Sequence, residues 1–159
     1  MNYFELFELP LAFKVDKTLL ARKYFELQKK YHPDFYTLEN EAEQAEALEM
    51  SSQVNKALQT LRNPDETIKY VLQLKGLLEE DEKYQLPPDF LMEVMELNED
   101  LGEGSAAAIS NLEADIQLPV ISILENYDDA STPTEDLLKV KEYYFKKKYL
   151  DRILERIGD

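Results

Sequence analysis

A helix that ends in a proline-bounded loop is encoded by residues 16–34, which read DKTLLARKYFELQKKYHPD. Asp16 is a residue type that favours the N-cap of a helix, and apolar residues recur after it at helical spacing. They are Leu20, Tyr24, Leu27 and Tyr31. Because Pro33 disfavours the helical conformation in the residue before it, we expect a helix over 17–31 and a loop over 32–39.

This predicted helix is basic, whereas the chain as a whole is strongly acidic. Residues 14–30 contain two acidic residues against Lys14, Lys17, Arg22, Lys23, Lys29 and Lys30. The whole chain of 159 residues has a formal net charge of −15. Such a charge predicts no nucleic acid and no membrane among the partners. The local basic patch suits an acidic partner surface, although charge alone favours a solvated helix face.

The composition excludes several classes of site. Hydrophobic residues make up 44% of the chain, enough for a core, and no stretch approaches the roughly 18 apolar residues of a membrane span. The start of the chain has no basic region followed by an apolar one, so no secretory signal is predicted and we expect a cytoplasmic location. Without cysteine, and with His32 as the single histidine, the chain is expected to hold no metal and no cofactor.

Helix signals continue along the chain and predict an all-α fold. Asn40 and Glu43 form a capping box for a helix ending at Leu61. We expect its inward residues to be Leu48, Val54, Leu58 and Leu61. The next helix is expected to begin after the N-cap Asn63 and to end at Gly76.

The second half of the chain is predicted to be a separate bundle. Residues 76–88 hold an acidic run and Pro87-Pro88, so we interpret them as a hinge or linker between domain 1–75 and domain 89–159. Three helices joined by short loops then predict an antiparallel three-helix bundle. The three helices are expected to start at Asp89, Ser105 and Thr132, and Pro119 is expected to break the middle one. The last helix is expected to end at Gly158.

The loop after the basic helix carries the first functional signal. Pro33 restrains His32, so His32 and Asp34 present a donor and a carboxylate at a set spacing. The plainer interpretation is that the three residues only end the helix. In this setting residues 1–75 resemble a J-domain, the module that engages DnaK-type chaperone ATPases. The resemblance implies that His32, Pro33 and Asp34 stimulate ATP hydrolysis in the partner. It assigns the electrostatic contact to Arg22, Lys23, Lys29 and Lys30.

Two further segments resemble the HscB-type co-chaperones of iron–sulfur cluster assembly. They are NYFELFELP at 2–10 and ALQTLRNP at 57–64. Glu8 departs from the family, which often has glycine there, and this difference is expected to affect the first turn but not the loop. The resemblance implies an HscA-like chaperone ATPase as one partner and a C-terminal three-helix bundle that binds an IscU-like cluster scaffold.

Residues 90–101, FLMEVMELNEDL, carry the second signal. Phe90, Val94, Leu97 and Leu101 form one apolar stripe, which suffices to anchor a helix. A second apolar strip on the same helix is either buried too or a binding face, and periodicity alone leaves both open. The resemblance implies a scaffold-binding face formed by Leu91, Met92, Met95, Glu96, Glu99 and Tyr149.

We therefore predict a bridging co-chaperone with no catalytic residue of its own. A first alternative keeps the J-domain and replaces the scaffold with another folded client that has no role in cluster assembly. A second alternative is an all-helical enzyme, for which the sequence offers only the run Glu79–Glu82 and the loosely spaced Glu125, Asp128 and Asp129. A solvated charge run explains these residues more simply.

Overall fold

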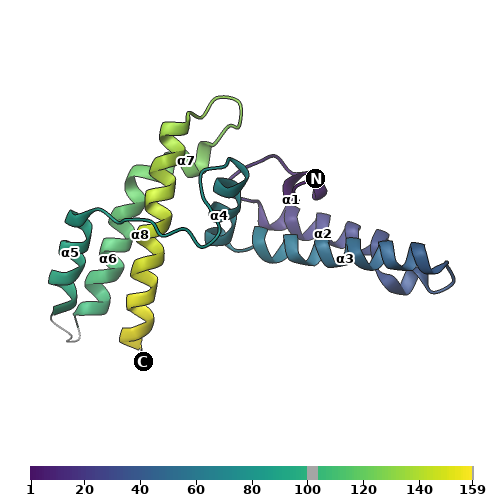
Figure 1. Ribbon diagram of the computed structural model, residues 1–159, viewed down its shortest axis with the longest axis horizontal. Coiled ribbons are helices and arrows are strands. Elements are labelled where there is room, and N and C mark those ends of the chain that lie inside the picture. The colour runs from purple at the N-terminus through teal and green to yellow at the C-terminus, as the bar shows by residue number, and fades with distance from the viewer. Residues whose placement is uncertain (100–103, 159) are drawn as a thin grey trace. The chain divides into compact units, whose positions relative to one another are not determined.

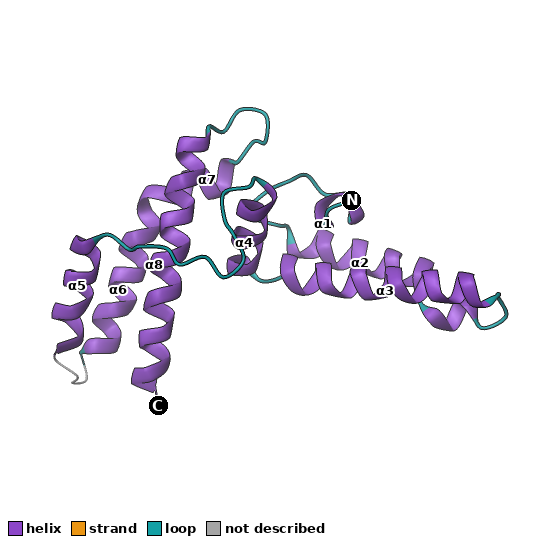
Figure 2. Ribbon diagram, viewed as in Figure 1, coloured by secondary structure: helices purple, strands orange, loops and turns teal. Residues whose placement is uncertain are grey.

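The computed structural model describes residues 1–99 and 104–158, with side chains described for 1–97 and 104–156. Over this range the chain is helical and contains no strand (Figure 2), which confirms the all-α prediction. It divides into two compact units, Met1–Val71 and Leu72–Asp159. The helices are α1 Tyr3–Leu6, α2 Lys17–Tyr31, η1 Pro33–Tyr36, α3 Glu41–Leu61, α4 Pro64–Leu74, α5 Pro88–Glu99, α6 Ser105–Gln117, η2 Leu118–Val120, α7 Ile121–Asn126 and α8 Thr134–Gly158, where η marks a 3-10 helix.

The first unit is built on a hairpin in which α2 and α3 lie side by side (Figure 1). The predicted caps begin its helices. The Asp16 side chain accepts from the backbone N–H groups of Thr18 and Leu19, at 2.9 and 3.0 Å. Asn40 accepts from Glu43 N–H at 2.8 Å, and Asn63 caps α4 in the same way. Each cap satisfies an N–H group that has no partner within its helix.

The inward face of α3 differs from our prediction. Val54 and Leu61 are buried as expected, but Leu48 is 61% exposed. The buried residues of the helix are Ala47, Ser51, Val54, Ala57 and Leu61. Their spacing of three and four residues follows the true contact line with α2. Leu48 lies one position beyond Ala47, so a small residue takes the inward place and the large one faces solvent.

Glu8 occupies a conformation that favours glycine, with a φ of 54°. It follows α1 in a Schellman motif, in which Leu9 N–H donates to Phe4 O at 2.8 Å and Glu8 N–H donates to Glu5 O at 3.1 Å. Gly76, with a φ of 73°, closes α4 in the same motif. Glu8, the position at which we expected this chain to differ from the family pattern, therefore lies in the turn that ends α1.

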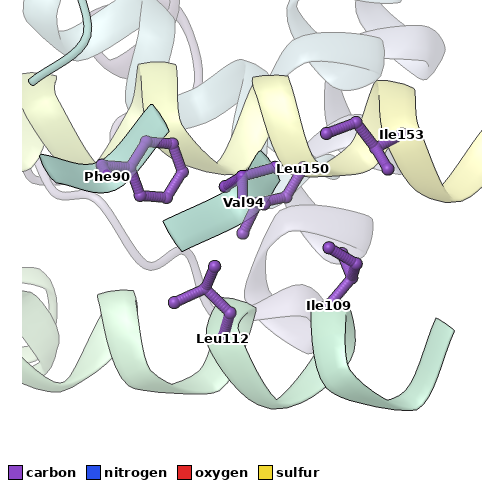
Figure 3. Packing of buried hydrophobic residues seen from close by; sticks show 6 residues of the cluster. All are labelled: Phe90, Val94, Ile109, Leu112, Leu150 and Ile153. Carbon is purple, nitrogen blue, oxygen red and sulfur yellow. The ribbon is translucent and has the colours of Figure 1, made fainter. Parts of the chain in front are cut away.

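The second unit is a bundle of α5, α6 and α8 (Figure 1). Its core interlocks side chains from all three helices, as Figure 3 shows: Phe90, Val94, Ile109, Leu112, Leu150 and Ile153. Burying each side chain of this size contributes about 1.5–3 kcal/mol. The bundle holds the outer face of α5 in place, because Phe90 and Val94 belong to the anchoring stripe.

Three local predictions in this unit had different outcomes. Pro119 interrupts the middle helix as expected, since η2 and α7 replace a continuous helix there. Ser105 does not cap α6: it is the first residue of the helix, and Gly104 takes the N-cap position without a side-chain bond. The Thr132 hydroxyl accepts from Asp128 N–H at 2.9 Å, so it closes the preceding loop, and α8 begins at Thr134.

One stretch of the second unit, Ser105–Asn126, is long and apolar enough by composition to cross a membrane. This differs from our prediction that no stretch would qualify. The stretch is broken by the 3-10 turn at Pro119, and Ile109 and Leu112 from it are part of the core.

The segment predicted as a linker, 76–88, makes specific contacts within the second unit. Glu82 forms an ion pair with Lys141 of α8 at 2.7 Å. The Tyr84 ring stacks on the Phe145 ring with centroids 4.6 Å apart and planes 4° from parallel. The segment is thereby held along α8, and Pro88 is the first residue of α5.

Candidate functional site

The loop with His32, Pro33 and Asp34, hereafter the HPD loop, is rigid because of its local chemistry. His32 ends α2 in an extended conformation, with φ −61° and ψ 132°, as the following proline requires. Pro33 then begins the 3-10 turn η1, which replaces the irregular loop that we predicted. Phe35 N–H donates to His32 O at 3.0 Å and closes this turn.

The imidazole of His32 bonds to the same turn. Its Nδ1 atom accepts a hydrogen bond from Asp34 N–H at 3.2 Å. An accepting Nδ1 requires the proton of the neutral ring to be on Nε2, which leaves Nε2 as a donor. The Asp34 carboxylate lies 3.6 Å from Nδ1 of His32. The Asp34 side chain is 85% exposed and the His32 side chain is 48% exposed. A donor and a carboxylate are thus both open to a partner.

Contacts from both neighbouring helices hold the HPD loop. The Tyr36 hydroxyl donates to Lys30 O, the last turn of α2, at 2.6 Å. The Gln44 amide of α3 donates to Thr37 O and Glu39 O at 3.2 and 3.0 Å. The Phe35 ring meets the His32 ring edge-on with centroids 6.3 Å apart. These bonds order the loop before any partner binds, which lowers the entropy cost of binding.

The predicted basic residues of α2 lead toward this loop. Arg22, Lys29 and Lys30 are exposed and lie on one face of the helix at positions i, i+7 and i+8. Lys23 is less exposed and lies 3.9 Å from Glu26. Lys29 and Lys30 also rest over the Phe25 and Tyr31 rings, at 4.6 and 5.1 Å. The aromatic contacts position the ammonium groups near the C-terminal end of α2, where cations are favoured.

Apolar side chains that our sequence analysis did not select flank the HPD loop. Phe25 and Phe35 are exposed, and Leu48 lines a shallow pocket of about 340 Å³ with Pro33, Thr37 and Gln44. Phe25 falls outside the apolar stripe of α2, and this position in the sequence could have predicted that its ring is exposed. Leu48 gave no such signal, because its exposure depends on how α3 is rotated against α2.

The second candidate site is the outer strip of α5, hereafter the α5 patch. Met92 and Met95 are 60% and 61% exposed, Glu96 is exposed, and Leu91 is half-buried. Glu99 is the last residue of α5, and its side chain lies outside the described residues. The flexible thioethers of two adjacent methionines suit an apolar contact surface that must adapt to a partner.

Tyr149 of α8 lies beside this helix. Its ring meets the Phe90 ring edge-on, with centroids 6.2 Å apart, so part of the tyrosine packs on the core. Tyr149 and Leu91 also line one groove of about 960 Å³. The structure thus brings these two predicted residues to a common surface, from helices about 60 residues apart in sequence.

Two of the acidic residues considered for an enzyme, Asp128 and Asp129, are engaged in structural contacts. Asp129 accepts from the Lys75 ammonium at 2.6 Å and from the Tyr127 hydroxyl at 2.8 Å, and these bonds lower its pKa. Burial and the same carboxylate raise the pKa of Tyr127 far above its ordinary value. Asp128 accepts from Ala130 N–H at 2.8 Å. Within the described residues, no three His, Cys, Asp or Glu side chains gather where they could hold a metal ion.

Comparison with known proteins gives the same family from three directions. Residues 86–158 match the model of the HSCB C-terminal oligomerisation domain. The co-chaperone protein HscB homologue of Photobacterium profundum is 33% identical over the whole length of both chains. The iron-sulfur cluster co-chaperone protein HscB of Mus musculus is 34% identical, covering 98% of this chain and 67% of that one. A Vibrio cholerae homologue is 42% identical, with the match spanning 64% of its length.

Two solved structures are similar over nearly the whole chain. The human co-chaperone protein HscB superposes with a TM-score of 0.79 at 29% identity, covering 99% of this chain and 81% of that one. The chaperone HscB from Vibrio cholerae gives 0.68 at 29% identity, covering 99% and 96%. Both the sequence and the helical architecture are therefore shared with these proteins.

Proposed function

This chain belongs to the HscB family of co-chaperones, and we propose that it stimulates an HscA-like chaperone ATPase and delivers an IscU-like cluster scaffold to it. The observation that carries the proposal is the presence of two chemically different exposed surfaces on separate units. The HPD loop with its basic helix belongs to the first unit. The α5 patch belongs to the second.

The HPD loop would act on the ATPase by contact and not by chemistry of its own. Arg22, Lys29 and Lys30 would steer an acidic face of the chaperone toward the loop, with Lys23 as a weaker contributor because it is shielded. The His32 Nε2–H and the Asp34 carboxylate would then bond to groups that position the nucleotide-hydrolysing site of the partner. ATP hydrolysis takes place in the chaperone, so we assign no catalytic residue to this chain.

The α5 patch would hold the scaffold. Leu91, Met92 and Met95 would supply the apolar centre and Glu96 the acidic rim. We propose the same role for Glu99 from its position in the sequence, three residues after Glu96. Tyr149 would extend the contact from α8. Engagement of both partners by one chain raises the effective concentration of the scaffold at the chaperone, which is the physical advantage of a bridging protein.

Steady-state ATP hydrolysis by the HscA-like chaperone tests this proposal. We expect stimulation by this chain that increases further when the IscU-like scaffold is added. Asp34→Asn removes the charge, keeps the size and should abolish both effects. Stimulation that does not respond to the scaffold would contradict the delivery role, and no stimulation at all would contradict the role of the HPD loop.

The alternative client is not favoured. The mouse relative is named an iron-sulfur cluster co-chaperone, which favours a role in cluster assembly over a role with an unrelated client. A pull-down that recovered a chaperone but no cluster-assembly protein would reverse this preference. We also propose a cytoplasmic location, which cell fractionation would test.

A further inference from the structure

The groove that Leu91 and Tyr149 share has a second side that the α5 patch does not include. Its volume of about 960 Å³ lies between the segment 81–88 and the C-terminal half of α8. The Glu82–Lys141 ion pair and the stacked Tyr84 and Phe145 rings hold the segment in place. The groove is therefore built by specific contacts and is present before a partner arrives.

The α8 side of the groove carries two exposed cations. Lys148 and Arg152 are exposed, four residues apart, and both line the groove. Other lysines of the helix have carboxylate partners: Lys141 pairs with Glu82, Lys146 with Glu142, and Lys147 with Glu113 and Asp151. Across the residues whose side chains are described, Lys148 and Arg152 have no such partner within 4.0 Å.

Charge and shape together define the occupant. Residues 76–159 carry 8 basic and 21 acidic residues, so a groove wall with two exposed cations contrasts with the overall charge of this unit. The groove is also lined by Asp81, Glu82 and Lys83, and Lys141 already neutralises Glu82. A ligand that lies here meets the apolar side chains of Leu91 and Tyr149 beside two positive groups.

We propose that this groove binds an acidic peptide segment of the client, with an apolar side chain against Leu91 and Tyr149 and carboxylates against Lys148 and Arg152. The inference deepens the proposed function, because it rests on the α5 patch being the client surface and extends it onto α8. The complete client surface would then carry both signs of charge, with an acidic end at Glu96 and a basic end at Arg152. A client would then dock in one orientation only, since reversal would place like charges together.

Charge reversal tests the groove in the complete protein. We expect Lys148→Glu with Arg152→Glu to weaken binding of the IscU-like scaffold about tenfold or more, as measured by calorimetry, and to reduce its salt dependence. The matched control is Lys56→Glu with Lys139→Glu, which makes the same change in net charge at exposed positions outside the groove. Equal affinities of the two double variants would overturn the proposal. Circular dichroism shows that each variant is folded.

A second experiment needs no scaffold, so it separates failure of this inference from failure of the proposed function. The ¹⁵N-labelled protein is titrated with an acetylated peptide of sequence EDELFDED, and with QNQLFNQN as the neutral control. We expect shifts of the amide resonances of 83–86, 89–91 and 148–152 with the acidic peptide only, lost in Lys148→Gln with Arg152→Gln. No shifts there, or equal shifts from both peptides, would contradict an acidic ligand.

Discussion

The Nδ1 atom of His32 accepts a hydrogen bond from the backbone N–H of Asp34 at 3.2 Å, across the intervening Pro33. This bond makes His32 the N-cap of η1 as well as the residue that ends α2. One side chain therefore shapes the loop and, through Nε2, offers a donor to a partner. The two roles can be separated by mutation, because capping needs only an acceptor near the backbone.

His32→Asn separates them. The asparagine oxygen can accept from Asp34 N–H and keep the turn, since Asn is among the best N-cap residues, but the Nε2 donor is lost. We expect chaperone ATPase stimulation to fall at least about tenfold, the loss of roughly one hydrogen bond to a charged group, while scaffold binding and thermal stability stay the same. Stimulation assays and thermal unfolding of both proteins check this. Full activity in His32→Asn would mean that the loop acts through its shape alone.

Met92→Ala with Met95→Ala should affect binding but not folding. Both side chains are more than half exposed, so their loss leaves no cavity. We expect scaffold binding to weaken by about 2 kcal/mol and the free energy of unfolding to change by less than about 0.5 kcal/mol. Val94→Ala, which lies between the two methionines but on the buried face of α5, is the contrasting control and should destabilise the protein by about 2 kcal/mol. A large loss of stability in the methionine variant would show that the α5 patch is core.

Glu8→Gly should stabilise the first unit. Glu8 has a φ of 54°, where a Cβ atom is unfavourable, and glycine relieves this strain at some cost in unfolded-state entropy. We expect a net gain of up to about 1 kcal/mol in chemical denaturation. Glu8→Ala keeps the Cβ and should bring no such gain. Identical stabilities of the glycine and alanine variants would indicate that backbone strain at this turn is negligible.

Acid should weaken the attachment of 76–88 to α8. The Lys141 ammonium, which donates to the Glu82 carboxylate, holds the pKa of Glu82 below its ordinary value of 4.5. For a depressed carboxyl pKa, the added stability is complete above the unfolded-state value and is lost as the pH falls through the folded-state value. We expect Glu82→Gln to cost about 1 kcal/mol or less at neutral pH.

The pH dependence of that difference is the measurement. Urea unfolding of the parent and of Glu82→Gln at pH 7 and at about pH 3.5 should give a smaller difference at the lower pH, where the unfolded carboxyl is protonated. Glu80→Gln is a control at another acidic position of the segment, where the carboxylate accepts a hydrogen bond from the Gln73 amide of α4 at 2.9 Å. If the difference in unfolding free energy between the two proteins grew in acid, the Glu82–Lys141 ion pair would not be what holds the segment on α8.

Local signals in the sequence predicted most of the helix boundaries. Asp16, Asn40 and Asn63 cap their helices as expected, and Pro119 breaks the middle helix of the bundle. Where such signals failed, a competing contact was available. Thr132 resembles a cap, but Asp128 N–H takes its hydroxyl. In the same way, Leu48 resembles a core residue of α3, but Ala47 allows closer packing against α2.

The order of the amino acids is enough to predict the all-helical class, the HPD loop and the basic face of α2. Each depends on hydrogen bonds and sterics among residues a few positions apart, which the order of amino acids states directly. Which apolar strip of α5 is buried, how 81–88 lies along α8, and the presence of Lys148 and Arg152 in one groove with Leu91 and Tyr149 follow only from the packing of the folded chain. These properties arise from contacts between segments far apart in the chain, where packing of whole helices selects among several locally acceptable arrangements.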